Sequence, residues 1–136
     1  IVTGDWSSDV CSSDLFLTIV TYLFGFIFIY QGFLWLTSPA QVAGSLGMPL
    51  LEGEGLSTQI GDFASFFFVV GLFILLGAYS KNKYWFYAPI ALLLIAAISR
   101  CIAYFFHEAA FATQSIMIEV LVACFLLFQV SRKKSH

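Results

Sequence analysis

Four long runs of apolar residues constrain this chain more than any other feature. They cover about residues 16–37, 58–80, 84–107 and 114–131. A hydrocarbon core about 30 Å thick requires about 20 mainly apolar residues in helical conformation, and each run is close to that length. A transmembrane β-barrel would instead show short segments of alternating polarity. The sequence therefore predicts an all-α membrane protein, an antiparallel bundle of four transmembrane helices.

The composition argues against a water-soluble domain. Of the 136 residues, 60% are hydrophobic and 10% are charged, whereas a soluble domain is nearer half apolar and a quarter charged. Too little polar surface would remain to cover the apolar side chains in water. The lipid bilayer is therefore the first expected partner, and residues 16–136 are expected to form a single membrane domain.

Residues 1–15 differ in kind from the rest of the chain. The segment Asp5–Leu15 is polar and acidic, and it resembles one reading frame of a sequencing adapter. It has neither the basic start nor the apolar centre of a signal peptide. We therefore expect residues 1–15 to be a non-native artefact of irregular or disordered conformation, without a role in function.

The basic residues outside the apolar runs fall on one side of the predicted bundle. Lys81 and Lys83 lie in the tight turn between the second and third runs, and Arg132 follows the fourth run together with two lysines. The connections 38–57 and 108–113 contain no base. By the positive-inside rule, both termini are predicted to be cytoplasmic. The expected location is a bacterial inner membrane.

Smaller features give expectations about packing. Trp35 and Tyr30 are predicted at the outer membrane interface, where aromatic residues concentrate. Ser38 and Pro39 predict the start of a short helical turn after the first run. Small residues are expected to let neighbouring helices approach closely. The glycines with this expected role are Gly25, Gly32, Gly61, Gly71 and Gly77.

Each predicted helix carries one strongly polar residue at a similar depth. These residues are Gln31, Asp62, Arg100 and Glu119, in chain order. At 1.5 Å per residue they lie roughly 6–10 Å below the outer boundary of their helices. A charged side chain at mid-bilayer costs about 2.5–3.5 kcal/mol on insertion scales, so such residues face other helices and pair. The sequence predicts a polar cluster that opens toward the outer face, with His107 at its rim.

Three interpretations of this cluster stay open at this stage. Arg100 between two carboxylates can form a structural ion network, because the planar guanidinium can hold both. The cluster can instead bind a ligand, a substrate or an ion. Two acids and one base leave an excess negative charge, which a proton, a cation or a ligand amine would balance. The charged groups can also extend separately to the lipid headgroups.

No motif in the sequence indicates an enzyme. It contains no Cys-x-x-Cys, no His-Glu-x-x-His, no phosphate-binding loop and no nucleophile elbow. His107 and His136 are too few for a haem pair or a metal site, and Cys101 and Cys124 lack motif spacing and are expected to be packing residues. We therefore expect no catalytic residue, no metal, no cofactor and no nucleic-acid partner.

Polar residues interrupt the apolar runs in four short segments, Gly61–Phe67, Ala96–Arg100, His107–Ala110 and Ile118–Val120. In these segments the chain resembles small uncharacterised bacterial four-helix inner-membrane proteins and, more distantly, the DoxX-like group. The resemblance implies the four-helix architecture and joint action of the three charged residues of the cluster. The DoxX-like group would further imply an accessory role in membrane redox chemistry linked to quinone.

The expected function is non-enzymatic. The polar cluster favours a membrane protein that binds a small amphiphile, a membrane protein partner or a second copy of itself. A transporter or proton-coupled carrier component is the first alternative, because intramembrane Asp, Glu and Arg form proton relays. Four helices without an inverted repeat leave that alternative little room for alternating access. An accessory subunit of quinone-linked redox chemistry is the second alternative.

Overall fold

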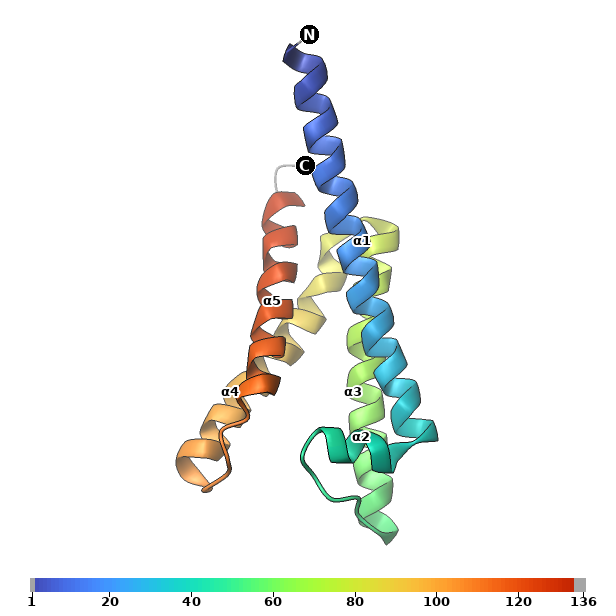
Figure 1. Ribbon diagram of the computed structural model, residues 1–136, viewed down its shortest axis with the longest axis vertical. Coiled ribbons are helices and arrows are strands. Elements are labelled where there is room, and N and C mark those ends of the chain that lie inside the picture. The colour runs from blue at the N-terminus through green and yellow to red at the C-terminus, as the bar shows by residue number, and fades with distance from the viewer. Residues whose placement is uncertain (1, 134–136) are drawn as a thin grey trace. The chain divides into compact units, whose positions relative to one another are not determined.

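The computed structural model describes the backbone of residues 2–133 and the side chains of residues 13–132 (Figure 1). Every regular element in this part of the chain is a helix. Four helical segments are long and apolar enough to cross a membrane: Ser13–Thr37, Gly53–Ser80, Lys83–Phe106 and Thr113–Arg132. The predicted all-α class and its four spans are confirmed.

The helices belong to two compact units, Ile1–Leu75 and Leu76–His136. The long helix α3 contributes its first part to one unit and its last turn to the other. The elements are α1 (Val2–Thr37), α2 (Pro39–Ser45), α3 (Gly53–Ser80), the 3₁₀ helix η1 (Lys83–Phe86), α4 (Tyr87–Phe106) and α5 (Thr113–Lys133).

The helix α1 begins at Val2, where the sequence predicted irregular chain up to Leu15. Extending an existing helix by one residue costs far less than nucleating a new one, so a polar stretch can continue the helix of the apolar run that follows it. Among the residues whose side chains are described, the part of α1 that is apolar enough to cross a membrane is Ser13–Thr37. The non-native origin of residues 1–15 stays a prediction.

In the first unit, α1 and α3 cross at two glycines. A Cβ atom added to Gly71 would lie 2.8 Å from the carbonyl oxygen of Gly25 and 2.8 Å from the amide nitrogen of Ile29. Two turns after Gly25 on α1, Gly32 faces the ring of Phe68, which lies about one turn before Gly71 on α3. The close approach predicted for Gly25, Gly32 and Gly71 is therefore confirmed, because only a residue without Cβ allows backbone contact at this crossing.

Two further glycines were predicted to be helix contacts, Gly61 and Gly77, and they differ in their surroundings. Gly77 lies in the second unit directly against the ring of Phe86, so its predicted contact role is confirmed. Gly61 has no described heavy atom within 4 Å of the position of a Cβ. Within the first unit Gly61 therefore makes no close helix contact, and its predicted role as a contact point stays a prediction.

The short helix α2 folds back over the end of α1 and closes a small apolar core around Trp35. Its first residue is Pro39, and Ser38 occupies the N-cap position, as predicted, although the Ser38 side chain makes no capping hydrogen bond. The Trp35 ring has no exposed surface and stacks on Phe63 at a centroid distance of 4.9 Å. The Trp35 indole is therefore covered by α2 rather than exposed, and its position at the depth of the outer interface stays a prediction.

The connection between α2 and α3 is held by Gln59. The Gln59 side chain is buried, and its Oε1 accepts a hydrogen bond of 3.0 Å from the amide of Leu51. Its Nε2 donates to the carbonyl oxygen of Pro49 at 3.2 Å and to Sδ of Met48 at 3.0 Å. One side chain thus satisfies backbone groups of a loop that has no secondary structure of its own.

Replacing Gln59 tests this role directly. We expect Gln59→Leu to lower the free energy of unfolding by about 2 kcal/mol, because the Leu51 amide and the Pro49 carbonyl lose their partner. Gln59→Glu is the matched variant: it keeps the acceptor for the Leu51 amide but places a buried carboxylate oxygen against the Pro49 carbonyl oxygen, so its loss of stability should be at least as large while the Leu51 amide stays hydrogen-bonded. Hydrogen exchange of the Leu51 amide in detergent should rise in Gln59→Leu only. Unchanged exchange would contradict the role.

In the second unit, a tight turn joins α3 to η1. Lys81 adopts a left-handed backbone conformation with φ 59°, which ends α3, and Oδ1 of Asn82 accepts a hydrogen bond of 3.0 Å from the amide of Tyr84. Phe86, which is fully buried, then packs against Gly77. This turn reverses the chain and starts α4.

The helices α4 and α5 pack side by side as an antiparallel hairpin (Figure 1). Apolar side chains on both helices are buried in this unit, namely Ile90, Leu93, Ala97, Val122, Ala123 and Leu126. The amides of His107 and Ala109 both donate to the carbonyl oxygen of Ala103, at 3.0 and 3.2 Å, while Glu108 turns with φ 58°. These bonds and the left-handed conformation of Glu108 end α4 and direct the chain back toward α5.

Candidate functional site

An ion pair joins the two helices of the α4–α5 hairpin. Nε of Arg100 donates hydrogen bonds to both carboxylate oxygens of Glu119, at 3.0 Å to Oε1 and 3.3 Å to Oε2. The Glu119 side chain is only 9% exposed, whereas that of Arg100 is 37% exposed. The pair therefore has a protected acidic half and an accessible basic half.

The register of the hairpin explains why these two residues meet. Arg100 precedes the end of α4 at Phe106 by six residues, and Glu119 follows the start of α5 at Thr113 by six residues. At 1.5 Å per residue both lie about 9 Å from the connecting loop. The sequence-based prediction that Arg100 and Glu119 share one level is thus met within this hairpin.

The guanidinium of Arg100 keeps most of its hydrogen-bonding capacity. It carries five N–H donors, and within the described part of the chain only the Nε donor is used, by Glu119. The two Nη groups make no hydrogen bond to described residues. In hydrocarbon an unsatisfied donor costs several kcal/mol, so these donors need acceptors from outside the hairpin.

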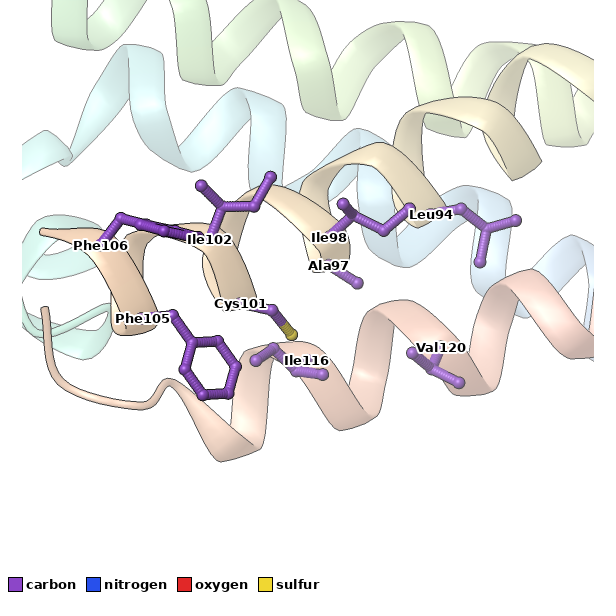
Figure 2. A pocket seen from close by; sticks show the side chains of 9 residues that line it. All are labelled: Leu94, Ala97, Ile98, Cys101, Ile102, Phe105, Phe106, Ile116 and Val120. Carbon is purple, nitrogen blue, oxygen red and sulfur yellow. The ribbon is translucent and has the colours of Figure 1, made fainter.

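An apolar hollow occupies the same turns of the hairpin as the ion pair. Its volume is about 350 Å³, and Figure 2 shows Cys101, Phe105 and Ile116 turned toward one another between the two helices. Its lining consists of Leu94, Ala97, Ile98, Cys101, Ile102, Phe105, Phe106, Ile116 and Val120. A strongly polar pair and an apolar depression thus lie within one or two helical turns of each other.

The other predicted members of the cluster lie on other segments of the chain. Gln31 and Asp62 belong to the first unit, where Gln31 is partly buried and Asp62 is exposed. His107 caps the end of α4 and is exposed. The joining of Gln31, Asp62 and His107 to the Arg100–Glu119 pair stays a prediction.

Groups able to hold a metal ion are not found among the described residues, where no three His, Cys, Asp or Glu side chains come together. Cys101 and Cys124 are free thiols, and Cys101 lines the apolar hollow. Cys101 is partly buried and Cys124 is exposed, so the packing role predicted for both cysteines stays a prediction.

Sequence reasoning missed two features of the molecule. The hydrogen bonds of Gln59 had a sequence signal, a lone amide at the second position of the second apolar run, but which loop groups this amide binds depends on how the loop folds. The hollow had none, because its lining residues are ordinary members of an apolar run. Only the packing of α4 on α5 sets them around one space.

The four long apolar helices indicate the class of protein to which this chain belongs. Four spans of sufficient length and hydropathy suit it to a lipid bilayer as a multi-pass helical membrane protein. Comparison with protein-family models, with curated proteins and with solved structures finds no match for this chain.

Proposed function

We propose that this protein is a non-enzymatic membrane protein that binds a small amphiphile at the Arg100–Glu119 pair. One observation carries the proposal: the Arg100 guanidinium is held by Glu119 through Nε alone, and both Nη groups are left to donate elsewhere. Such an arrangement orients four N–H donors toward an acceptor group. The ligand polar group would therefore be a carbonyl, carboxylate or phosphate oxygen.

The surroundings of the pair support an amphiphilic ligand over a purely polar one. The hollow along the same turns offers about 350 Å³ and is lined by apolar side chains, within the range of volumes that small-molecule sites occupy. An acyl or isoprenoid tail suits such a space. On the positive-inside distribution of Lys81, Lys83 and Arg132, we further propose a bacterial inner membrane, cytoplasmic termini and a pair close to the outer face.

Arg100→Lys tests the proposal. Lysine keeps the positive charge that Glu119 needs but lacks the planar fork of donors, so the hairpin should persist while the ligand is lost. Native mass spectrometry of protein released gently from its own membranes should show a discrete added mass on the wild type. That mass should decrease at least about tenfold in Arg100→Lys, which corresponds to about 1.4 kcal/mol of binding free energy.

A control variant separates ligand binding from general lipid retention. Arg132→Lys changes the same residue type at the end of α5 and should leave the added mass unchanged. If the wild type carries no adduct that is lost in Arg100→Lys, the result would contradict the proposed function and favour a purely structural ion pair.

A further inference from the structure

Basic residues gather at the end of the second unit opposite the 107–112 loop. Lys81 and Lys83 lie in the turn between α3 and α4, and Arg132 lies in the last turn of α5. These segments are neighbours in space, because η1 packs against α5. Three bases from two chain segments therefore share one end of the hairpin.

Aromatic rings accompany these bases. Nζ of Lys83 lies 5.7 Å from the centroid of the Tyr84 ring, and Cζ of Arg132 lies 5.9 Å from the Phe128 ring. Both distances are within cation–π range. Tyr84 and Tyr87, whose ring centroids are 5.8 Å apart, are exposed, as is Trp85. The aromatic side chains thus form an exposed apolar and polarisable surface beside the basic side chains.

The acidic residues of this unit lie far from that end. Among its described residues they are Glu108, in the loop at the opposite end, and Glu119. Glu119 is engaged by Arg100 and precedes Arg132 by thirteen residues of α5, which is about 20 Å along the helix. Within the described part of this unit, no acidic residue therefore lies within the Debye length of about 8 Å, at physiological salt, of the basic end.

The depth of this basic end in the membrane indicates which molecules it can bind. The spans Lys83–Phe106 and Thr113–Arg132 start and finish here, so the bases lie where hydrocarbon gives way to headgroups. Tyr and Trp side chains occupy the same level in membrane proteins. Anionic phospholipids present a phosphate at that level, and each nearby Lys or Arg strengthens attraction to an anionic surface by about fivefold.

We propose that the basic end of the second unit is a binding site for the headgroups of anionic phospholipids. Lys81 and Lys83 bind the lipid phosphate, Arg132 adds charge from α5, and Tyr84, Trp85 and Tyr87 contact the glycerol and upper acyl region. This site is independent of the amphiphile site proposed at Arg100, which lies about 20 Å away along the hairpin.

Trp85 provides a local reporter for the test. The chain has three tryptophans, so Trp6→Phe with Trp35→Phe leaves Trp85 alone. In vesicles, acyl-brominated phosphatidylglycerol should quench Trp85 at a mole fraction at least about fivefold lower than acyl-brominated phosphatidylcholine does. Lys81→Gln with Lys83→Gln should remove this preference, and Lys81→Arg with Lys83→Arg should retain it.

A second measurement does not depend on the tryptophan substitutions. Wild-type protein released from mixed nanodiscs of the two lipids should retain phosphatidylglycerol in excess, and the glutamine variant should retain both equally. The proposal would be overturned if both lipids quench Trp85 equally in the protein that keeps Lys81 and Lys83. It would also be overturned if the preference for phosphatidylglycerol persists in the variant with both lysines replaced by glutamine. Loss of the preference on adding inorganic phosphate at matched ionic strength would also overturn it, in favour of a free anion site.

Discussion

Arg100→Ala should lower the free energy of unfolding by about 3 kcal/mol, because it leaves a carboxylate without its counter-charge inside the hairpin. The Glu119 side chain is 9% exposed, and its described hydrogen-bond donor is Nε of Arg100. After the substitution Glu119 must either stay charged in a poorly solvated position or take up a proton. Unfolding in mixed micelles of a mild detergent and dodecyl sulfate measures the loss.

The paired substitution Arg100→Leu with Glu119→Leu serves as the control. Removing both charges together eliminates the uncompensated carboxylate, and apolar side chains suit a membrane span, so most of the lost stability should return. A loss below about 0.5 kcal/mol in Arg100→Ala, or a double variant as unstable as the single one, would show that the pair does not hold α4 to α5.

Gly71→Leu should separate α1 from α3 in the first unit. Even the Cβ atom of the new side chain would lie 2.8 Å from the backbone of Gly25 and Ile29, and backbone atoms of two packed helices cannot move aside as a side chain can. Overpacking of this kind costs about 1–3 kcal/mol, and the larger leucine side chain places it at the upper end or above. The same micelle unfolding assay measures the effect.

The matched control lies on the same helix. Gly61→Leu introduces the same change where no described atom lies within 4 Å of a Cβ, so it should be neutral or slightly stabilising through better helix propensity. Gly25→Ala should be milder than Gly71→Ala, since its closest contact is the flexible side chain of Leu75. Equal effects of Gly71→Leu and Gly61→Leu would contradict the close crossing.

The spans and the ion pair could be predicted from the sequence because lipid leaves few choices. Long apolar runs fix where helices cross, and a charge such as Arg100 inside one of them must be neutralised by another polar residue at its own depth. Counting residues from the loop that joins the two helices places Glu119 at the depth of Arg100. The same counting could not join Gln31 or Asp62, because it gives depth along a helix but not the rotation of that helix.

Features that depend on helix rotation and chain reversal lay beyond the sequence. Gly61 and Gly71 look equivalent in the apolar run of α3, and only the crossing with α1 distinguishes them. Trp35 has the position of an interfacial residue, but α2 folds over it. Helix ends also differ: α3 starts at Gly53 rather than near residue 58, because hydropathy measures the membrane-crossing part of a helix and not the polar turns that continue it.

The Arg100–Glu119 bond has a consequence for how the chain enters its membrane. The two opposite charges lie on consecutive helices joined by a short loop, so they can neutralise each other as soon as both helices have been synthesised. Either helix alone would bring a bare ion into hydrocarbon. During biogenesis, α4 should therefore leave the insertion machinery together with α5, and the hairpin is the smallest part of this unit that lipid accepts.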